Sequence, residues 1–103
     1  MEQTERIMQM EQCLDQLTEA VRELTAALDK YDAAQAAVRA LSTYLSSGEW
    51  TKDYEADEAG LLPDNLKRGV LSQDGIWNTM NDCRELDVRM LEIVTGRMKA
   101  NLL

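Results

Sequence analysis

Histidine and phenylalanine are absent from the 103-residue sequence, and proline occurs only once. Without histidine, a serine or cysteine nucleophile lacks its usual general base, and the two cysteines lack the ligands that complete most zinc sites. These absences argue against hydrolytic catalysis and against a structural metal. We predict no catalytic residue, no metal ligand and no cofactor, and we expect that the chain is not an enzyme.

Positive charge and long apolar runs are also scarce. Eleven lysine and arginine residues stand against 19 aspartate and glutamate residues, which gives a net charge of −8. A chain this acidic is repelled by the phosphates of nucleic acids and of anionic membranes. No apolar run approaches the roughly 20 residues of a membrane span, and the polar N-terminus does not resemble a signal peptide. We predict a cytoplasmic protein that binds neither nucleic acid nor a membrane.

Helix-forming residues in a heptad pattern are abundant in the first half of the chain. Apolar residues recur in steps of three and four over residues 4–46, with Gln35 and Ser42 in two of the apolar positions. The pattern predicts one helix over about 4–46, roughly 60 Å long, capped by Thr4 and ended by Gly48. The main stripe comprises Ile7, Met10, Leu14, Leu17, Val21, Leu24, Leu28, Tyr31, Val38 and Leu45. A second stripe, of mostly small residues, comprises Cys13, Ala20, Ala27, Ala34 and Leu41.

Residues 47–72 interrupt the helical pattern, and we predict that they form an ordered connector with short helices. Trp50 and Tyr54 share one face of a short helix, and Pro63 starts a further helical turn that Gly69 ends.

A second long helix is predicted over about 73–101, with Ser72 as its cap. Gly96 lies inside this helix and costs about 1 kcal/mol relative to alanine. Its inward-facing residues are expected to be Ile76, Met80, Cys83, Leu86, Met90, Val94 and Met98.

Together these elements predict one all-α domain over residues 1–103, with the two long helices in an antiparallel hairpin. The first helix is longer, so roughly 20 Å of it extends beyond its partner. Burying the four apolar side chains of this overhang is worth about 6–10 kcal/mol before ordering costs. We therefore expect a homodimer in which the first helices pair. The overhanging stripe comprises Ile7, Met10, Leu14 and Leu17.

The two cysteines are far apart in the sequence. Cys13 and Cys83 are expected to be small buried apolar groups. The hairpin separates them by about 35 Å, so no disulfide between them is expected.

A long motif runs through the connector. It reads Trp50-x-x-Asp53-Tyr54-Glu55-x-Asp57-Glu58, then Leu62-Pro63-x-x-Leu66-Lys67-Arg68-Gly69-Val70-Leu71-Ser72, then Asp74-x-Ile76-Trp77. With this motif and the Lys30-Tyr31 pair of the leading helix, nearly the whole chain resembles an uncharacterised family of short bacterial proteins known as a domain of unknown function. The resemblance implies a small, helical, cytoplasmic protein and brings no activity or catalytic residue. Gly75 departs from the family pattern, in which a better helix former such as alanine is expected, and it weakens the start of the second helix.

The acidic residues of the connector have two interpretations. Asp53 and Asp57 share a helix face within an acidic cluster, and such a cluster could bind a hard cation. The spacing lacks the glycine and the terminal glutamate of a calcium loop. We favour ion pairs of these acids with Lys67 and Arg68 across the turn at Pro63.

The basic and aromatic residues of the connector also allow two interpretations each. The Lys67-Arg68 pair resembles a minimal anion site, although cations near the end of a helix also complement its dipole. Trp50, Tyr54 and Trp77 could form a platform for a ligand, but packing at helix ends is the interpretation that we favour.

The sequence therefore supports two hypotheses about function. The first is a non-catalytic helical protein that acts by self-association and by contact with an unidentified cytoplasmic protein. The alternative is a small-ligand, anion or metal-binding module centred on residues 49–72. Its candidate residues are Trp50, Asp53, Tyr54, Asp57, Lys67, Arg68 and Trp77.

Overall fold

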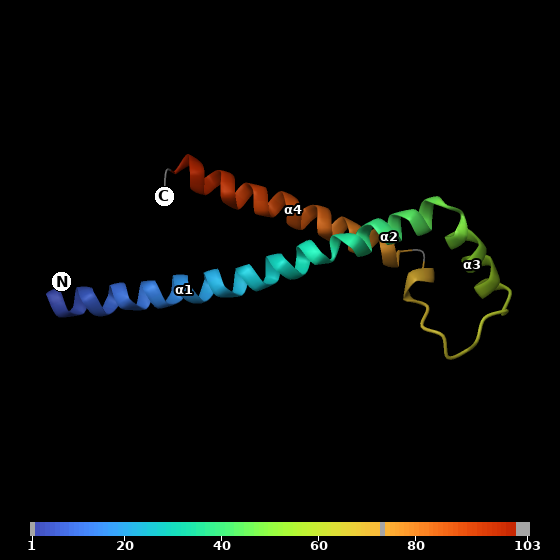
Figure 1. Cartoon of the computed structure of the whole chain (residues 1–103), viewed down its shortest axis with the longest axis horizontal. Helices are drawn as coiled ribbons and strands as arrows, with labels where there is room; N and C mark the ends of the chain where they lie inside the picture. Colours follow the sequence, from blue (N-terminus) through green and yellow to red (C-terminus); the bar gives the residue numbers. More distant parts are fainter. Residues whose placement is uncertain (1, 73, 101–103) are drawn as a thin grey trace. The chain divides into compact units, whose positions relative to one another are not determined.

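The computed structural model describes residues 2–72 and 74–100, and every regular element within those ranges is helical (Figure 1). The prediction of an all-α chain is thereby confirmed. None of these helices has the length and apolarity needed to cross a membrane. The chain divides into two units, Met1–Ala37 and Val38–Leu103. In chain order the elements are α1 (Gln3–Ala33), α2 (Gln35–Ser46), α3 (Glu49–Glu58), the 3₁₀ helix η1 (Gly69–Leu71) and α4 (Gly75–Lys99).

The first unit consists mainly of α1, a helix of 31 residues in which no residue is buried. The seven apolar side chains of the main stripe from Ile7 to Leu28 expose between 42% and 64% of their surface. The helix begins one residue earlier than predicted, and its N-cap is Glu2, without a side-chain capping bond. The predicted cap at Thr4 is therefore wrong, because Thr4 already lies inside the first turn.

The prediction of one uninterrupted helix over 4–46 is also wrong, because the helix is interrupted at Ala34. The Tyr31 carbonyl accepts the N–H of Ala34 at 3.1 Å and the side-chain amide of Gln35 at 3.3 Å. In a regular helix this carbonyl accepts the backbone N–H four residues later, which belongs to Gln35. The Gln35 side chain competes with its own backbone N–H for that carbonyl. Next along the chain, Ala37 N–H bonds the Ala34 carbonyl at 2.9 Å, and this bond over three residues is tighter than the four-residue bond of an α-helix.

In the second unit, two glycines end α2 and α3. Gly48 has a φ of 88° and Gly60 a φ of 72°, a backbone conformation that glycine adopts without steric cost. After α3, Leu61 N–H bonds the Ala56 carbonyl and Gly60 N–H bonds the Asp57 carbonyl, each at 3.0 Å. This pair of bonds is the Schellman motif, and it satisfies carbonyls that the helix end leaves open. The predicted left-handed stop at Gly48 is confirmed.

No helix forms at Pro63, where the sequence predicts a helical turn. The segment instead makes a non-helical turn in which Leu66 N–H donates to the Pro63 carbonyl at 3.2 Å. The Arg68 side chain donates to the carbonyls of this segment, so they need no helical N–H donors. Gly69 begins η1 and does not end a helix, which corrects its predicted role.

The core of the second unit lies where η1 meets α3 and α4. Leu71 of η1 and Ile76 of α4 expose only 6% and 5% of their surface. In Figure 1 the chain leaves α3 in an extended segment and returns to η1 beside the start of α4.

The helix predicted over 73–101 corresponds to α4, and residues 73 and 101 themselves lie outside the described part of the chain. The Ser72 hydroxyl accepts the N–H of Gly75, the first residue of α4, and donates to the Gly69 carbonyl, both at 3.0 Å. The N-cap residue of α4 is nevertheless Asp74, without a side-chain capping bond, so the predicted cap at Ser72 lies two residues too early.

The two cysteines differ in exposure, and neither is in a disulfide. Cys83 is half-buried in α4, whereas Cys13 is exposed on α1. The expectation of a buried Cys13 is wrong, because α1 buries none of its residues.

Candidate functional site

The centre of the connector is an ion pair between α3 and the segment before η1. Arg68 Nε donates to Asp57 Oδ1 at 2.7 Å, and both side chains are about three-quarters buried. The other guanidinium nitrogens donate to the carbonyls of Asp64 at 3.1 Å, of Leu66 at 3.3 Å and of Pro63. One side chain thus ties the whole turn at Pro63 to α3. The ion pair that the sequence predicts between the acidic cluster and Arg68 is present.

The aromatic residues of α3 form a second tie to the core. Trp50 and Tyr54 are half-buried and stack on each other, with ring centroids 5.1 Å apart and an angle of 18° between the planes. The indole N–H of Trp50 donates to the Val70 carbonyl at 2.7 Å. Trp50 therefore joins α3 to η1, and its indole N–H bonds within the chain.

Asp53 pairs with a tyrosine of α2 and not with the basic residues of the connector. The Tyr44 hydroxyl donates to Asp53 Oδ2 at 2.5 Å, across the turn at Gly48 that separates α2 from α3. This hydrogen bond to the carboxylate, together with desolvation and nearby negative charge, raises the pKa of Tyr44 to about 12. Because the hydroxyl donates this bond, its deprotonation would remove the bond between α2 and α3.

Two of the predicted site residues stand apart from this cluster. Trp77 lies on α4 with 58% of its surface exposed, so it does not join Trp50 and Tyr54. Lys67 is exposed and forms no ion pair with any described residue, so the predicted pairing of the acidic cluster with Lys67 is wrong.

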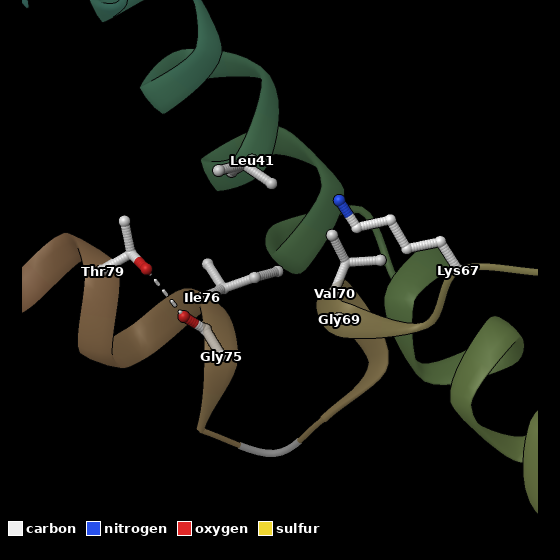
Figure 2. A pocket seen from close by; sticks show the side chains of 7 residues that line it. All are labelled: Leu41, Lys67, Gly69, Val70, Gly75, Ile76 and Thr79. Carbon is white, nitrogen blue, oxygen red and sulfur yellow. Dashed lines mark hydrogen bonds between the residues drawn. The ribbon is translucent and has the colours of Figure 1, made fainter.

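Lys67 lies instead at the edge of an open hollow of about 480 Å³. Figure 2 shows side chains from α2, the connector and α4 around this hollow. Its lining is mostly aliphatic, and Lys67 is the one charged residue among Leu41, Lys67, Gly69, Val70, Gly75, Ile76 and Thr79.

Gly75 has a packing role that sequence reasoning missed. A Cβ at this position would lie 2.6 Å from the Gly69 carbonyl oxygen and 2.6 Å from Ser72 Oγ. The two groups bond each other, and the Gly69 oxygen is a backbone atom, so a Cβ at position 75 would force η1 to shift. The expectation that alanine would be the better residue here is therefore wrong, because η1 approaches the first turn of α4 too closely.

Three of the candidate charged side chains of the connector bond within the fold. Asp57 and Arg68 form an ion pair, and Asp53 accepts a hydrogen bond from the Tyr44 hydroxyl. Within the described ranges, no three histidine, cysteine, aspartate or glutamate side chains are grouped so as to hold a metal ion. The cluster is therefore organised as a set of ties that hold α2, α3 and η1 together. Of the two candidate cations, Lys67 is the one that forms no ion pair with any described residue.

A family described as "Domain of unknown function (DUF4298)" matches residues 7–93. The match covers most of the sequence, so the chain belongs to this family, and the expected resemblance to an uncharacterised domain family is confirmed. No curated protein and no solved structure is significantly similar to the chain.

Proposed function

Within this family, we propose that the chain is a non-catalytic helical protein that acts by self-association. Two copies would pair through the first part of the main stripe of α1, which comprises Ile7, Met10, Leu14 and Leu17. The observation that carries the proposal is that α1 buries none of its residues although its apolar stripe extends from Ile7 to Leu28.

The length of this stripe is what makes a solvated state costly. Scattered exposed apolar side chains are normal on a protein surface, but a contiguous apolar face marks an interaction site. A single amphipathic helix also has no tertiary packing of its own, and packing supplies most of the stability of helices in proteins. A second copy offers a matching stripe at the same position in every heptad.

The antiparallel hairpin remains our proposal for the remainder of the fold. In it, the apolar face of α4 covers the later part of the main stripe, and Ile7, Met10, Leu14 and Leu17 are left for the second copy. The support is that α4 also has an exposed apolar face, which includes Leu91 and Val94 at 68% and 51% exposure. A further cytoplasmic protein would then contact the assembled dimer outside these faces.

A matched pair of variants on α1 tests self-association. Leu14→Gln removes an apolar group from the stripe, and glutamine has nearly the same helix propensity as leucine. Met8→Gln removes a similarly exposed apolar group one residue after Ile7, about 100° around the helix and outside the stripe. We expect sedimentation velocity to show a dimer for the parent chain and for Met8→Gln, and a weaker dimer for Leu14→Gln. Equal behaviour of the two variants would show that the stripe is not the interface.

The two native cysteines allow a direct test of the hairpin. Each unit contains one of them, Cys13 or Cys83, so spin labels on both report the distance between the units. Labelled chains diluted with an excess of unlabelled chains report distances within one chain. The hairpin predicts about 35 Å from the helix rise. A broad distribution, or a clearly different distance, would rule out the hairpin and leave self-association to be judged by sedimentation.

The alternative function is supported by the unpaired Lys67 beside the aliphatic hollow. Such a site suits a small anion with an apolar part, since the ammonium group would bind the charge and the hollow would bind the remainder. A thermal-shift series with short-chain and aromatic carboxylates tests it, because a ligand that binds the native state must stabilise it. The Lys67→Gln variant should lose any shift. No shift in the parent chain at millimolar carboxylate would remove this alternative.

A further inference from the structure

The charged residues that flank the main stripe of α1 are few, and their positions distinguish the two directions in which two copies can pair. In a heptad that places Ile7 and Leu14 at position a and Met10 at position d, Arg6 occupies position g and Glu11 position e. These flanking positions face the partner helix at the edge of an apolar seam. Neither Arg6 nor Glu11 forms an ion pair within the described chain, so both are available to a partner.

A parallel pair in register brings opposite charges together. In that arrangement a g residue of one helix faces the e residue of the other helix five positions later. Arg6 of one copy therefore faces Glu11 of the second copy, and the twofold symmetry repeats the contact on the other side. The later g residues are Cys13, Ala20 and Ala27, which carry no charge, so no like-charge contact opposes the arrangement.

An antiparallel pair brings no opposite charges together at these flanking positions. Position g then faces g of the other helix, and e faces e. The g residues other than Arg6 are cysteine and alanine, so Arg6 finds no acidic partner in any antiparallel register. Glu11 would face either a threonine or an acid, because the e positions of α1 are Thr4, Glu11, Thr18, Thr25 and Asp32. The charges therefore favour only the parallel direction.

We propose that two copies of the chain pair in parallel and in register along α1, held in direction by two symmetric ion pairs between Arg6 of one copy and Glu11 of the other. The proposal rests on the self-association proposed above and adds its direction and register. Because α1 starts at Gln3, both contacts lie in the first three turns of the helix, within the stretch that the hairpin leaves uncovered.

A charge-exchange experiment tests the direction separately from self-association. Arg6→Glu and Glu11→Arg each turn both contacts of a homodimer from attractive to repulsive, whereas a mixed dimer of the two variants has two attractive contacts. A homodimer of the double variant Arg6→Glu/Glu11→Arg also has two attractive contacts between its copies. Asp15→Arg is the matched control, because it changes the net charge as Glu11→Arg does but lies at position b, away from the seam.

The measured quantity is the dimer dissociation constant from sedimentation equilibrium. We expect each single variant to dimerise about tenfold more weakly than the parent, since two exposed contacts of under about 1 kcal/mol each become repulsive. The equimolar mixture and the double variant should recover the parent affinity, and Asp15→Arg should leave it nearly unchanged. A parent dimer with no recovery in the mixture or the double variant would overturn the parallel direction and leave self-association standing. A monomeric parent chain would overturn both proposals.

Discussion

Arg68 and Asp57 join the turn at Pro63 to α3, with Arg68 Nε 2.7 Å from Asp57 Oδ1. The remaining guanidinium nitrogens donate to three backbone carbonyls of the same turn, so a single side chain fixes a segment that has no helix of its own. A lysine could replace the charge but could not reproduce a planar fork with five donors.

Arg68→Lys should therefore lower the free energy of unfolding by about 2 kcal/mol, because hydrogen bonds to charged groups at a half-buried site are lost. Urea denaturation monitored by circular dichroism measures this change. Arg22→Lys is the control, since the Arg22–Glu19 pair on α1 is solvent-exposed and such pairs contribute little to stability. Equal effects of the two substitutions would show that the Arg68 ties do not stabilise the connector.

The two tryptophans should respond differently to truncation. Trp50→Ala removes a half-buried ring, its stacking on Tyr54 and its bond to the Val70 carbonyl, which together should cost about 2–3 kcal/mol. Trp77→Ala removes a ring with 58% of its surface exposed and should cost less than about 1 kcal/mol. Thermal melts of both variants in parallel measure the difference. A larger loss for Trp77→Ala would mean that an element packs over it.

Gly75 and Gly96 form a matched pair of glycines in α4. Gly75→Ala should destabilise the fold by about 1–3 kcal/mol, because its Cβ would overlap the Gly69 carbonyl. Gly96→Ala has nothing within 4 Å of the new Cβ and should stabilise the helix by up to about 1 kcal/mol. Chemical denaturation of both variants measures whether each substitution lowers or raises the free energy of unfolding. Stabilisation by Gly75→Ala would contradict the close approach of η1 to α4.

The Tyr44–Asp53 hydrogen bond predicts a stability change at alkaline pH. The folded-state pKa of Tyr44, about 12, lies above the value of about 10 for an unperturbed tyrosine. The bond's contribution is therefore complete below about pH 10 and is lost as the pH rises toward 12. Subtracting the ultraviolet titration of Tyr44→Phe from that of the parent chain isolates the Tyr44 hydroxyl. A midpoint near 10 in this difference would show that the bond is not formed in solution.

Several features of the fold follow directly from local sequence. The heptad steps of residues 4–46 predict the helical segments because apolar residues spaced three and four apart fall on one face of a helix with 3.6 residues per turn. Gly48 stops α2 because it takes a left-handed conformation that few other residues adopt. The Asp57–Arg68 pair was predicted because opposite charges flank a turn that proline imposes.

The features that the sequence does not reveal depend on contacts between segments. The requirement for glycine at position 75 appears only when the Gly69 carbonyl is placed beside it. Tyr44 was not identified because its partner Asp53 belongs to the next helix, and the angle at Gly48 brings them together. The interruption at Ala34 depends on which donor the Tyr31 carbonyl accepts, a competition that residue spacing does not resolve.

We expect the exposed stripe of α1 to pair with a second copy of the chain. The most direct test of this pairing is the molar mass of the parent chain, measured by light scattering during size-exclusion chromatography over a range of micromolar concentrations. We predict twice the 11.7 kDa of one chain, falling toward the single-chain mass only on dilution. A mass of 11.7 kDa at every concentration, with full helical content by circular dichroism, would contradict it.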